Sequence, residues 1–455
     1  MFIVFLPALN FRGNRSPYLW WFHKLLSAFG DTAAYICGDE YFSDLEQLLT
    51  AGRTDVSHDL ARAFQYCLPD HATLQNQLRA DVPLRVWQGL EERFPSNPLA
   101  AFNYYCLQDD EELRVAITDA LDQIVARVGE EIEAVVTCVN CATLQKLCRA
   151  RNLPLVHMEL GPLRQPAFLQ TAYFDFSGVN GGTEAHSRFD SDPEKTKAPD
   201  YWASVENLRS LFMIRPISAV PHASVDLGLG LQVEDDSNVV CYANGHSALS
   251  LINNGRRSLF EGDINPPILV RSHPGSFFSL QTLPAGLEND TSATSVDFVV
   301  RCRQIHSINS GVAVEGLLLD RAVLVRGACS FSYCVKPDTG ECREPEFAFF
   351  LLNYLVPWHL AFQPDYIRWR MNNPTERVIR QRHLEGFMQD KIRLLELRVS
   401  ELERSLRESE ERMAQIKSSF VWRLLWPLRA LYSICHKYID RMLLSCRQYW
   451  RQKER

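Results

Sequence analysis

The sequence predicts an α/β protein with two parallel-sheet domains followed by a long helix. Short apolar runs that are typical of buried strands alternate with helical patterns, first over residues 1–160 and again over 226–325. This alternation favours parallel sheets flanked by helices. The chain has 455 residues, which is enough for two or three domains. We expect the parts of the chain to be 1–165, 166–205, 206–376, 377–417 and 418–455.

The first domain contains apolar strands at four places. The predicted strands are 2–6, 34–37, 134–138 and 154–158, and the predicted helices are 20–29, 111–128 and one that begins at 142. The N-terminal sequence MFIVFLPAL has no basic region and no small-residue cleavage site. We therefore expect a strand there and not a signal peptide. A polar loop, 8–18, follows this strand.

The second domain follows a polar segment rich in Asp, Glu, Lys and Pro. We interpret this segment, 182–203, and the glycine-rich loop before it as a junction over 166–205. The predicted strands of the second domain are 226–232, 268–270, 298–300 and 322–325, with a helix at 247–253. The aromatic stretch 345–375 is expected to form closing helices.

The composition excludes several classes of protein. Hydrophobic residues make up 46% of the chain and charged residues 23%, which is ordinary for a globular protein. The net charge of −7 argues against nucleic-acid binding by the whole chain. Thirteen cysteines, an odd number without the spacing of a disulfide framework, favour a reducing cytoplasm. The sequence contains no run of 18 apolar residues, so it predicts no membrane span.

From Leu384 onward the sequence has a heptad pattern with Ser409 as its one polar break. The apolar positions are Ile392, Val399, Leu406 and Met413, and, offset from them, Met388, Leu395, Leu402 and Ile416. This pattern predicts a coiled coil and therefore a homo-oligomer through 384–417. The alternative is a solvated helix that packs on its own domain.

The tail is strongly basic. Residues 417–455 hold nine Lys or Arg and two acidic residues, so nine minus two gives +7 and leaves −14 for the remainder. An apolar stripe and interleaved Trp and Tyr accompany this charge. Such a helix suits the headgroups of an anionic membrane. We expect a cytoplasmic protein held peripherally on the inner membrane face by 418–455; the alternative is a basic helix that contacts protein.

The segment 270–333 is the strongest candidate for a ligand site. An apolar strand delivers Arg271 and His273 onto a loop, and a small polar turn, 307–311, follows His306 and precedes a short helix. Ligands of doubly wound sheets bind at the carboxyl ends of the strands, and the start of a helix favours an anion. Arg and His would add charge-assisted bonds to a phosphate. We therefore predict a nucleotide-sugar phosphate site.

Acidic residues after two predicted strands are candidates for catalysis. Glu159 lies just past the fourth strand, and the acidic run 234–236 ends the strand 226–232. A lone Glu in such a place is more often a solvated loop residue, and acids after a strand usually cap the next helix. Cys138 and Cys141 have CxxC spacing without a second pair, so we expect no zinc site.

Five short motifs in this order resemble the bacterial β-Kdo glycosyltransferases of capsule and lipopolysaccharide biosynthesis. They are ELGPLR, FDFSGVNG, QVEDDS, RSHPG and S-I-N-S-x-x-x-x-E-x-L, and they lie within residues 130–340. The segment SSFVWRLLWPLR, 418–429, is similar to an ending that follows coiled coils in many surface-polysaccharide glycosyltransferases. The resemblance implies a GT-B-like pair of Rossmann-type domains, then a coiled coil and an amphipathic helix, and retaining transfer from CMP-Kdo.

The resemblance also implies roles for individual residues. Asp236 matches the carboxylate that is proposed to attack the anomeric carbon, with Asp235 as the second candidate. Glu159 matches a cleft Glu suited to acid/base work on the acceptor hydroxyl. His273 would bind the CMP phosphate, and Glu315 would hold the ribose. The expected donor-binding residues are His273, Arg271, Pro274, Ser307, Asn309, Ser310, Glu315, Gln232 and Arg164.

Three functions remain open at this level. The first is transfer of Kdo from CMP-Kdo to a lipid-linked or oligosaccharide acceptor of capsule, O-antigen or lipopolysaccharide. It needs no cofactor and no metal, because His, Arg and the start of a helix can stabilise the leaving phosphate. Arg271 or Arg164 could hold the carboxylate of Kdo. The second is transfer of another CMP-ulosonic acid, and the third is a non-catalytic coiled-coil scaffold for glycan enzymes.

Overall fold

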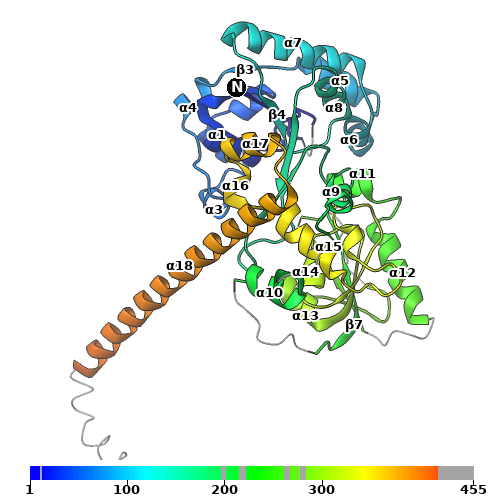
Figure 1. The fold of residues 1–455 in the computed structure, drawn as a ribbon, viewed down its shortest axis with the longest axis vertical. Helices are drawn as coiled ribbons and strands as arrows, with labels where there is room; N and C mark the ends of the chain where they lie inside the picture. The colour runs from blue at the N-terminus through cyan, green and yellow to red at the C-terminus, as the bar shows by residue number, and fades with distance from the viewer. Residues whose placement is uncertain are drawn as a thin grey trace, which may run out of the picture. The chain divides into compact units, whose positions relative to one another are not determined.

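Two β-sheets organise the first compact unit of the chain, Met1–Lys391, and Ile392–Arg455 forms a second unit (Figure 1). The computed structural model describes residues 1–10, 13–195, 201–214, 222–260, 267–273, 275–276 and 283–418. Both sheets contain neighbouring parallel strands with helices around them. The predicted α/β architecture with a GT-B-like pair of domains is confirmed by this arrangement.

The first sheet has seven strands in the order β12-β6-β5-β4-β1-β2-β3. Their bounds are β1 Phe2–Phe5, β2 Ala33–Ile36, β3 Arg79–Ala80, β4 Ala134–Thr137, β5 Leu155–Leu160, β6 Thr171–Asp175 and β12 Val356–Pro357. Strands β1 to β5 pair in parallel, whereas β6 pairs antiparallel with both β5 and β12. The carboxyl ends of β1, β4 and β5 therefore meet at one edge, where ligands of such sheets bind.

Helices cover both faces of the first sheet. On one face, α5 to α8 pack against the sheet through a core that includes Trp87 and Ile117. Figure 1 shows these helices grouped together, away from α1. The bounds are α1 Leu19–Phe29, α2 Leu45–Thr50, α3 His58–Ala63, α4 His71–Gln75, α5 Leu84–Glu92, α6 Pro98–Leu107, α7 Glu111–Val128 and α8 Ala142–Ala150, with 3₁₀ turns at Gly30–Thr32 and Asp39–Phe42.

The chain returns to the first sheet after it has built the second. Trp358, Phe362 and Tyr366 are buried in the same core as α1, on the second face of the first sheet. The returning elements are α15 Glu344–Phe349, a π-helical turn Phe350–Tyr354, β12, α16 Trp358–Ala361 and α17 Pro364–Met371. The helices predicted over 345–375 are present, and they complete the first domain.

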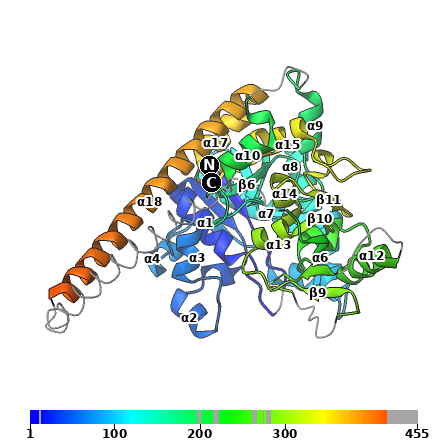
Figure 2. The same ribbon diagram turned by 90° about the horizontal axis from the view of Figure 1, so that it is seen from below.

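The second sheet has five parallel strands in the order β11-β10-β7-β8-β9. Their bounds are β7 Val225–Gly230, β8 Ile268–Arg271, β9 Leu287–Asn289, β10 Cys302–Ser307 and β11 Ala322–Val325. The helices of this region are α9 Ala185–Ser191, α10 Val205–Phe212, α11 Ser237–Tyr242, α12 Ala248–Phe260, α13 Ser295–Arg301 and α14 Val312–Leu318, with 3₁₀ turns at Tyr201–Ala203 and Ser332–Cys334. Helices α13 and α14 lie beside β10 and β11 (Figure 2).

One predicted strand is a helix. Residues 298–300 lie within α13, where Thr294 and Asp297 form a capping box that satisfies the first N–H groups of the helix. The strand of this region is β10, which begins directly after α13 and includes His306. The prediction was wrong because a short apolar run fits a buried helix as well as a buried strand.

The predicted junction over 166–205 contains regular structure. Strand β6 extends the first sheet, and its burial on both faces explains the aromatic residues of TAYFD. Helix α9 follows the glycine-rich loop. Residues 171–175 therefore belong to the first sheet and are not a connection between the domains.

The chain continues from the first unit into α18, Glu376–Ser418. Its first turns are anchored, because Ile379, His383 and Phe387 are buried. The predicted heptad residues Ile392, Val399 and Leu406 are exposed by 53%, 54% and 59%, so the described residues do not cover the apolar seam. No helix of the described residues is long and apolar enough to cross a membrane. The predicted membrane-binding tail, 418–455, lies almost entirely outside the described residues.

Candidate active site

A cavity of about 270 Å³ joins the carboxyl ends of strands from both sheets. The first domain contributes Glu159 from β5 and side chains from the loops after β1 and β4. The second domain contributes the acidic segment between β7 and α11. The lining residues are Asn14, Pro17, Tyr18, Cys138, Glu159, Asp235, Asp236 and Ser237. The three predicted catalytic residues therefore face one space.

Glu159 is half-buried and faces this cavity near the end of β5. Loss of hydration and, to a smaller extent, the charge of Asp236 raise the pKa of its carboxyl to about 8, against the opposing charge of Arg164. At neutral pH a carboxyl with this pKa is mostly protonated. Glu159 is therefore poised for proton transfer near the operating pH, as general acid–base catalysis requires.

Asp236 caps helix α11 and remains accessible from the cavity. Its Oδ1 accepts a hydrogen bond from the backbone N–H of Asn238 at 2.8 Å. The surrounding protein limits hydration and raises the pKa of Asp236, while the bond from Asn238 and the charge of Arg164 oppose the rise. Asp235 lines the same cavity. The bond from Asn238 thus fixes one oxygen of Asp236 at the backbone, while the residue still lines the cavity.

Arg164, whose side chain is exposed, supplies positive charge to the site. Its Nε donates to the carbonyl oxygen of Gly161 at 2.9 Å, which anchors the guanidinium to the loop after β5. The Arg164 charge lowers the pKa of Asp236 and of His273, and it lowers the pKa of Glu315 in the second domain. One cation therefore acts on groups from both domains.

His273 follows β8 and stays accessible to solvent. Its Nδ1 accepts a hydrogen bond from the backbone N–H of Gly275 at 3.0 Å, so the neutral ring carries its proton on Nε2. Partial burial lowers the pKa of His273, and the charge of Asp236 opposes this shift. The neutral imidazole can therefore donate one hydrogen bond from Nε2. Pro274 lies outside the described residues.

Arg271 is engaged within the second domain. Its Nη1 lies 2.5 Å from Oδ2 of Asp290, whose side chain is fully buried, and it also donates to the carbonyl oxygen of Ser292 at 3.1 Å. Arg301 pairs with the same carboxylate at 3.3 Å. Arg271, a predicted donor-binding residue, is thus already paired with a buried carboxylate. Among the described residues, the hydrogen bond of Arg164 goes to a backbone carbonyl oxygen and not to a buried acid.

Gln232 and Asn309 hold each other. The amide of Gln232 donates to Oδ1 of Asn309 at 2.8 Å and accepts from the Asn309 backbone N–H at 3.0 Å. Nδ2 of Asn309 also donates to the carbonyl oxygens of Asn238 and Ala328, at 2.9 and 3.2 Å. These two predicted donor-binding residues therefore join the ends of β7 and β10 to helix α11.

The remaining predicted donor-binding residues cluster between β10 and α14. Ser307 ends β10, and Ser310 accepts a hydrogen bond from the N–H of Val312 at 3.3 Å. Burial raises the pKa of Glu315 to about 7, against a hydrogen bond from Ser295. Oε2 of Glu315 and the hydroxyl of Ser307 are buried, and neither has a partner among the described residues. These atoms can accept or donate further hydrogen bonds.

One residue of the predicted ligand segment lies away from the cavity of Glu159 and Asp236, and two residues that line this cavity were not predicted. His306 lines a separate cavity with Asp226 and Arg303. It does not line the cavity that contains Glu159 and Asp236. Asn14 and Tyr18, which were not predicted, line the cavity of Glu159 and Asp236. The polar loop 8–18 was the available signal, because loops at the carboxyl ends of parallel strands carry functional residues.

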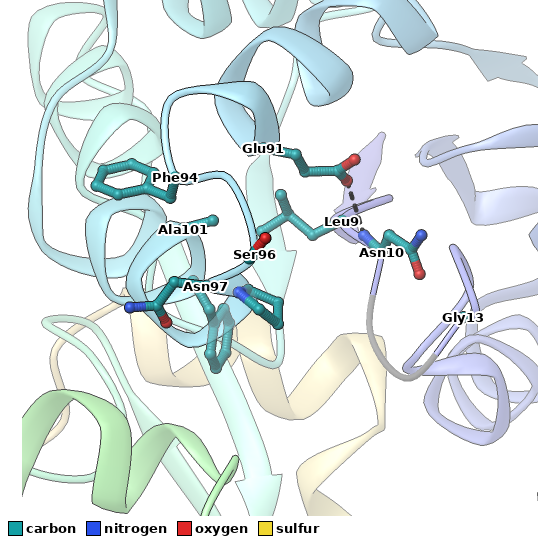
Figure 3. Close-up of a pocket in the computed structure, with 10 residues that line it drawn as sticks. Leu9, Asn10, Gly13, Glu91, Phe94, Ser96, Asn97 and Ala101 are labelled. Atoms are coloured by element: carbon teal, nitrogen blue, oxygen red, sulfur yellow. Dashed lines mark hydrogen bonds between the residues drawn. The ribbon is translucent and has the colours of Figure 1, made fainter.

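The loop after β1 also borders a second cavity of about 370 Å³ (Figure 3). Oε1 of Glu91 accepts a hydrogen bond from the backbone N–H of Asn10 at 2.9 Å, and Arg15 pairs with the same carboxylate. The lining residues are Leu9, Asn10, Gly13, Glu91, Phe94, Ser96, Asn97, Pro98, Ala101 and Phe102. Gly13 lines this second cavity, and Asn14 lines the cavity of Glu159 and Asp236, so the same loop borders both cavities.

Residues 4–184 match the Glycosyltransferase 99 family N-terminal domain. The match spans the first sheet up to the glycine-rich loop, including β5 with Glu159. It bears out the coarser prediction that the protein is a glycosyltransferase, which implies a sugar donor and an acceptor. No curated protein sequence matches the chain.

Several solved structures are similar at low identity. The β-Kdo 2,7 transferase of Thermosulfurimonas dismutans KpsC has 14% identity and a TM-score of 0.36, over 52% of this chain and 82% of that one. The β-Kdo 2,4 transferase of the same protein has 18% identity and a TM-score of 0.37, over 49% and 81%. The glycosyltransferase SnogD from Streptomyces nogalater has 13% identity and a TM-score of 0.27, over 88% and 99%.

Proposed function

We propose that the protein is a retaining glycosyltransferase that moves Kdo from CMP-Kdo to a glycan acceptor of bacterial surface polysaccharide. The observation that carries the proposal is the shared cavity of Glu159 and Asp236, with Arg164 beside both. Retention through two displacements needs one carboxylate to attack the anomeric carbon and a second group to handle the acceptor proton. The five ordered sequence motifs support Kdo as the sugar.

In the first step, an oxygen of Asp236 forms a bond to the anomeric carbon as the bond from that carbon to the phosphate oxygen breaks. CMP leaves with the electron pair of the broken bond. Nε2–H of His273 and the guanidinium of Arg164 are the donors that would stabilise its phosphate. Arg164 is also our candidate for the carboxylate of Kdo, since Arg271 is already paired with Asp290.

Before the second step, Glu159 releases its own proton to solvent and becomes a carboxylate. The acceptor hydroxyl then attacks the same carbon, and its proton passes to the Glu159 carboxylate. The oxygen of Asp236 leaves as a free carboxylate. Ester formation in the first step removes the negative charge of Asp236, and this charge is one cause of the raised pKa of Glu159. The pKa of Glu159 therefore falls when the intermediate forms, which makes it a better base for the step that follows.

The binding roles follow from the two edges of the cavity. Glu315, whose Oε2 is buried without a partner among the described residues, is our candidate to accept hydrogen bonds from the ribose. The acceptor would approach over the first domain, where the second cavity offers amides, a carboxylate and aromatic rings to a sugar. A donor with another ulosonic acid fits the same roles. A non-catalytic scaffold does not account for two carboxylates of raised pKa in one cavity.

The experiment is donor selection by the purified full-length chain. CMP release is measured with CMP-Kdo, with a second CMP-ulosonic acid and with a nucleoside diphosphate sugar, each with and without a bacterial glycolipid extract. We expect acceptor-dependent release from CMP-Kdo and retention of configuration in the product. Release only from the second CMP donor would establish the alternative substrate. CMP binding without release from any donor would support the scaffold.

We also propose that the chain self-associates through 384–417 and binds anionic membrane through 418–455. The exposed apolar seam of α18 supports the first proposal, and the +7 charge of residues 417–455 supports the second. Leu402→Glu should dissociate the oligomer in sedimentation, whereas Arg404→Glu, which lies off the seam, should not. Truncation after Ser418 should abolish binding to phosphatidylglycerol vesicles. An unchanged mass or unchanged vesicle binding would contradict the respective proposal.

A further inference from the structure

Helix α11 links the candidate nucleophile to the interface between the two domains. Asp236 caps its first turn, and Tyr242 is its last residue. The helix has only six residues, so a shift at Tyr242 is transmitted directly to Asp236. The contacts of this helix therefore bear on where the carboxylate lies in the cavity.

The hydroxyl of Tyr242 is held by the first domain. Nδ2 of Asn140, in the loop after β4, donates to the Tyr242 hydroxyl at 2.6 Å and to the carbonyl oxygen of Val179 at 2.8 Å. The backbone N–H of Val179 donates to Oδ1 of Asn140 at 2.9 Å. Asn140 is thus fixed by the glycine-rich loop, and its second amide hydrogen points to Tyr242.

The glycines of this loop make room for the contact. A Cβ atom at Gly181 would overlap the ring of Tyr242, and one at Gly182 would lie 3.3 Å from its hydroxyl. A Cβ atom at Gly178 would lie 2.8 Å from Oδ1 of Asn140. None of these three glycines has a positive φ, so the requirement is for space. The motif FSGVNGG, which sequence reasoning could explain only as a turn or a family signature, is therefore a socket for Tyr242.

Other bonds clamp α11 along its length. From the first domain, Asn103 donates to the carbonyl oxygen of Val240 at 2.8 Å, and Asn180 donates to the hydroxyl of Ser237 at 2.8 Å. From the second domain, the N–H of Ala328 donates to the carbonyl oxygen of Tyr242 at 2.8 Å. The helix is therefore shared between the domains and does not belong to the second domain alone.

We propose that Tyr242, Asn140 and the loop 178–182 form an interdomain latch that positions Asp236 opposite Glu159. The latch rests on the proposed function only for its effect on catalysis. Tyr242 is a positioning residue, because it acts through Asp236 and not on the substrate. A misplacement of about 1 Å in an active site can reduce the rate by roughly 100-fold. Loss of the latch should therefore reduce kcat while donor binding by His273 and Arg164 persists.

The test compares Tyr242→Phe with Tyr104→Phe in the full-length protein. Tyr104 lies on α6 next to Asn103, but its hydroxyl faces Arg93 and Asp110. The same atom is therefore removed near α11 without removing any of the bonds to α11 described above. We measure hydrogen exchange of the amides 237–242, the affinity for CMP, and kcat and KM for the donor. For Tyr242→Phe we expect faster exchange in α11, CMP affinity within about twofold, and kcat lower by about 10- to 100-fold. Tyr104→Phe should change none of these.

The outcomes separate the latch from the proposed function. Unchanged exchange of α11 in Tyr242→Phe would overturn the latch, whatever the enzyme transfers. Equal losses of kcat and CMP affinity would also overturn it, because they indicate a general structural role. If the wild-type chain transfers no sugar, faster exchange confined to Tyr242→Phe and Gly181→Ala still supports the latch, and the proposed function alone fails.

Discussion

Glu159 and Asp236 face the same cavity but are held in different ways. Glu159 belongs to β5, which is paired on both sides by β4 and β6. Asp236 caps a six-residue helix that is bonded to both domains. The comparison teaches that one sheet alone fixes the proposed acid/base group, whereas the proposed attacking group depends on contact between the domains. Substitutions at the two carboxylates should therefore have different consequences.

The largest effect is expected for Asp236→Ala. Removal of the nucleophile should reduce transfer by about 10⁴-fold, since residual activity would rest on binding and electrostatics alone. Asp235→Ala is the matched control on the same segment and should lose roughly tenfold at most. Steady-state CMP release measures both. If Asp235→Ala lost about 10⁴-fold in activity while Asp236→Ala stayed active, Asp235 and not Asp236 would be the nucleophile, which would contradict the proposed role of Asp236.

Glu159→Gln should reduce turnover by about 10²- to 10⁴-fold through loss of the acid/base group. The first step needs no base, because the proposed nucleophile is itself a carboxylate, and no acid, because the leaving phosphate is stabilised as an anion. The variant should therefore release one equivalent of CMP in a burst and then stall. Rapid-quench measurement of CMP follows this burst. If Glu159→Gln showed no burst, because its first step was as slow as overall turnover, Glu159 would not act specifically in the second step.

Much of the fold could be predicted from the sequence, whereas the meeting of these carboxylates could not. The strands 2–6 and 134–138 were recognisable because their apolar runs are bounded by polar loops. Residues 298–300 were assigned to a strand because the capping box that makes them helical depends on Thr294 and Asp297, which precede or interrupt the apolar run. Arg271 meets Asp290 because β8 pairs with β9. No sequence motif predicts this pairing.

A smaller effect separates the two arginines. Arg164→Ala should weaken CMP-sugar binding by about 10- to 100-fold, which is the loss of one or two charged hydrogen bonds. Arg271→Ala should lower the Tm instead, because it removes a partner of the fully buried Asp290. Calorimetric titration with CMP and thermal unfolding distinguish the two. Equal loss of affinity in both variants, without a change in Tm, would return Arg271 to the donor site.

The smallest effect is a shift of a single pKa. Glu159 should titrate near pH 8 in the wild type, because its pKa is about 8. In Asp236→Asn the negative charge that raises this pKa is removed, so Glu159 should lose its proton at lower pH. Carbon NMR of the labelled carboxyl group, assigned with Glu159→Gln, reports the titration. An identical midpoint in Asp236→Asn would mean that the two carboxylates are not coupled.

The central claim, that carboxylates from two domains divide a double displacement, is tested most directly by mass spectrometry of the stalled enzyme. Glu159→Gln is mixed with CMP-Kdo, and the intact mass is recorded before peptide mapping. The account predicts a mass gain of one Kdo residue on the peptide that contains Asp236, and no gain in Glu159→Gln/Asp236→Ala. CMP release without an adduct, or an adduct on any other residue, would contradict it.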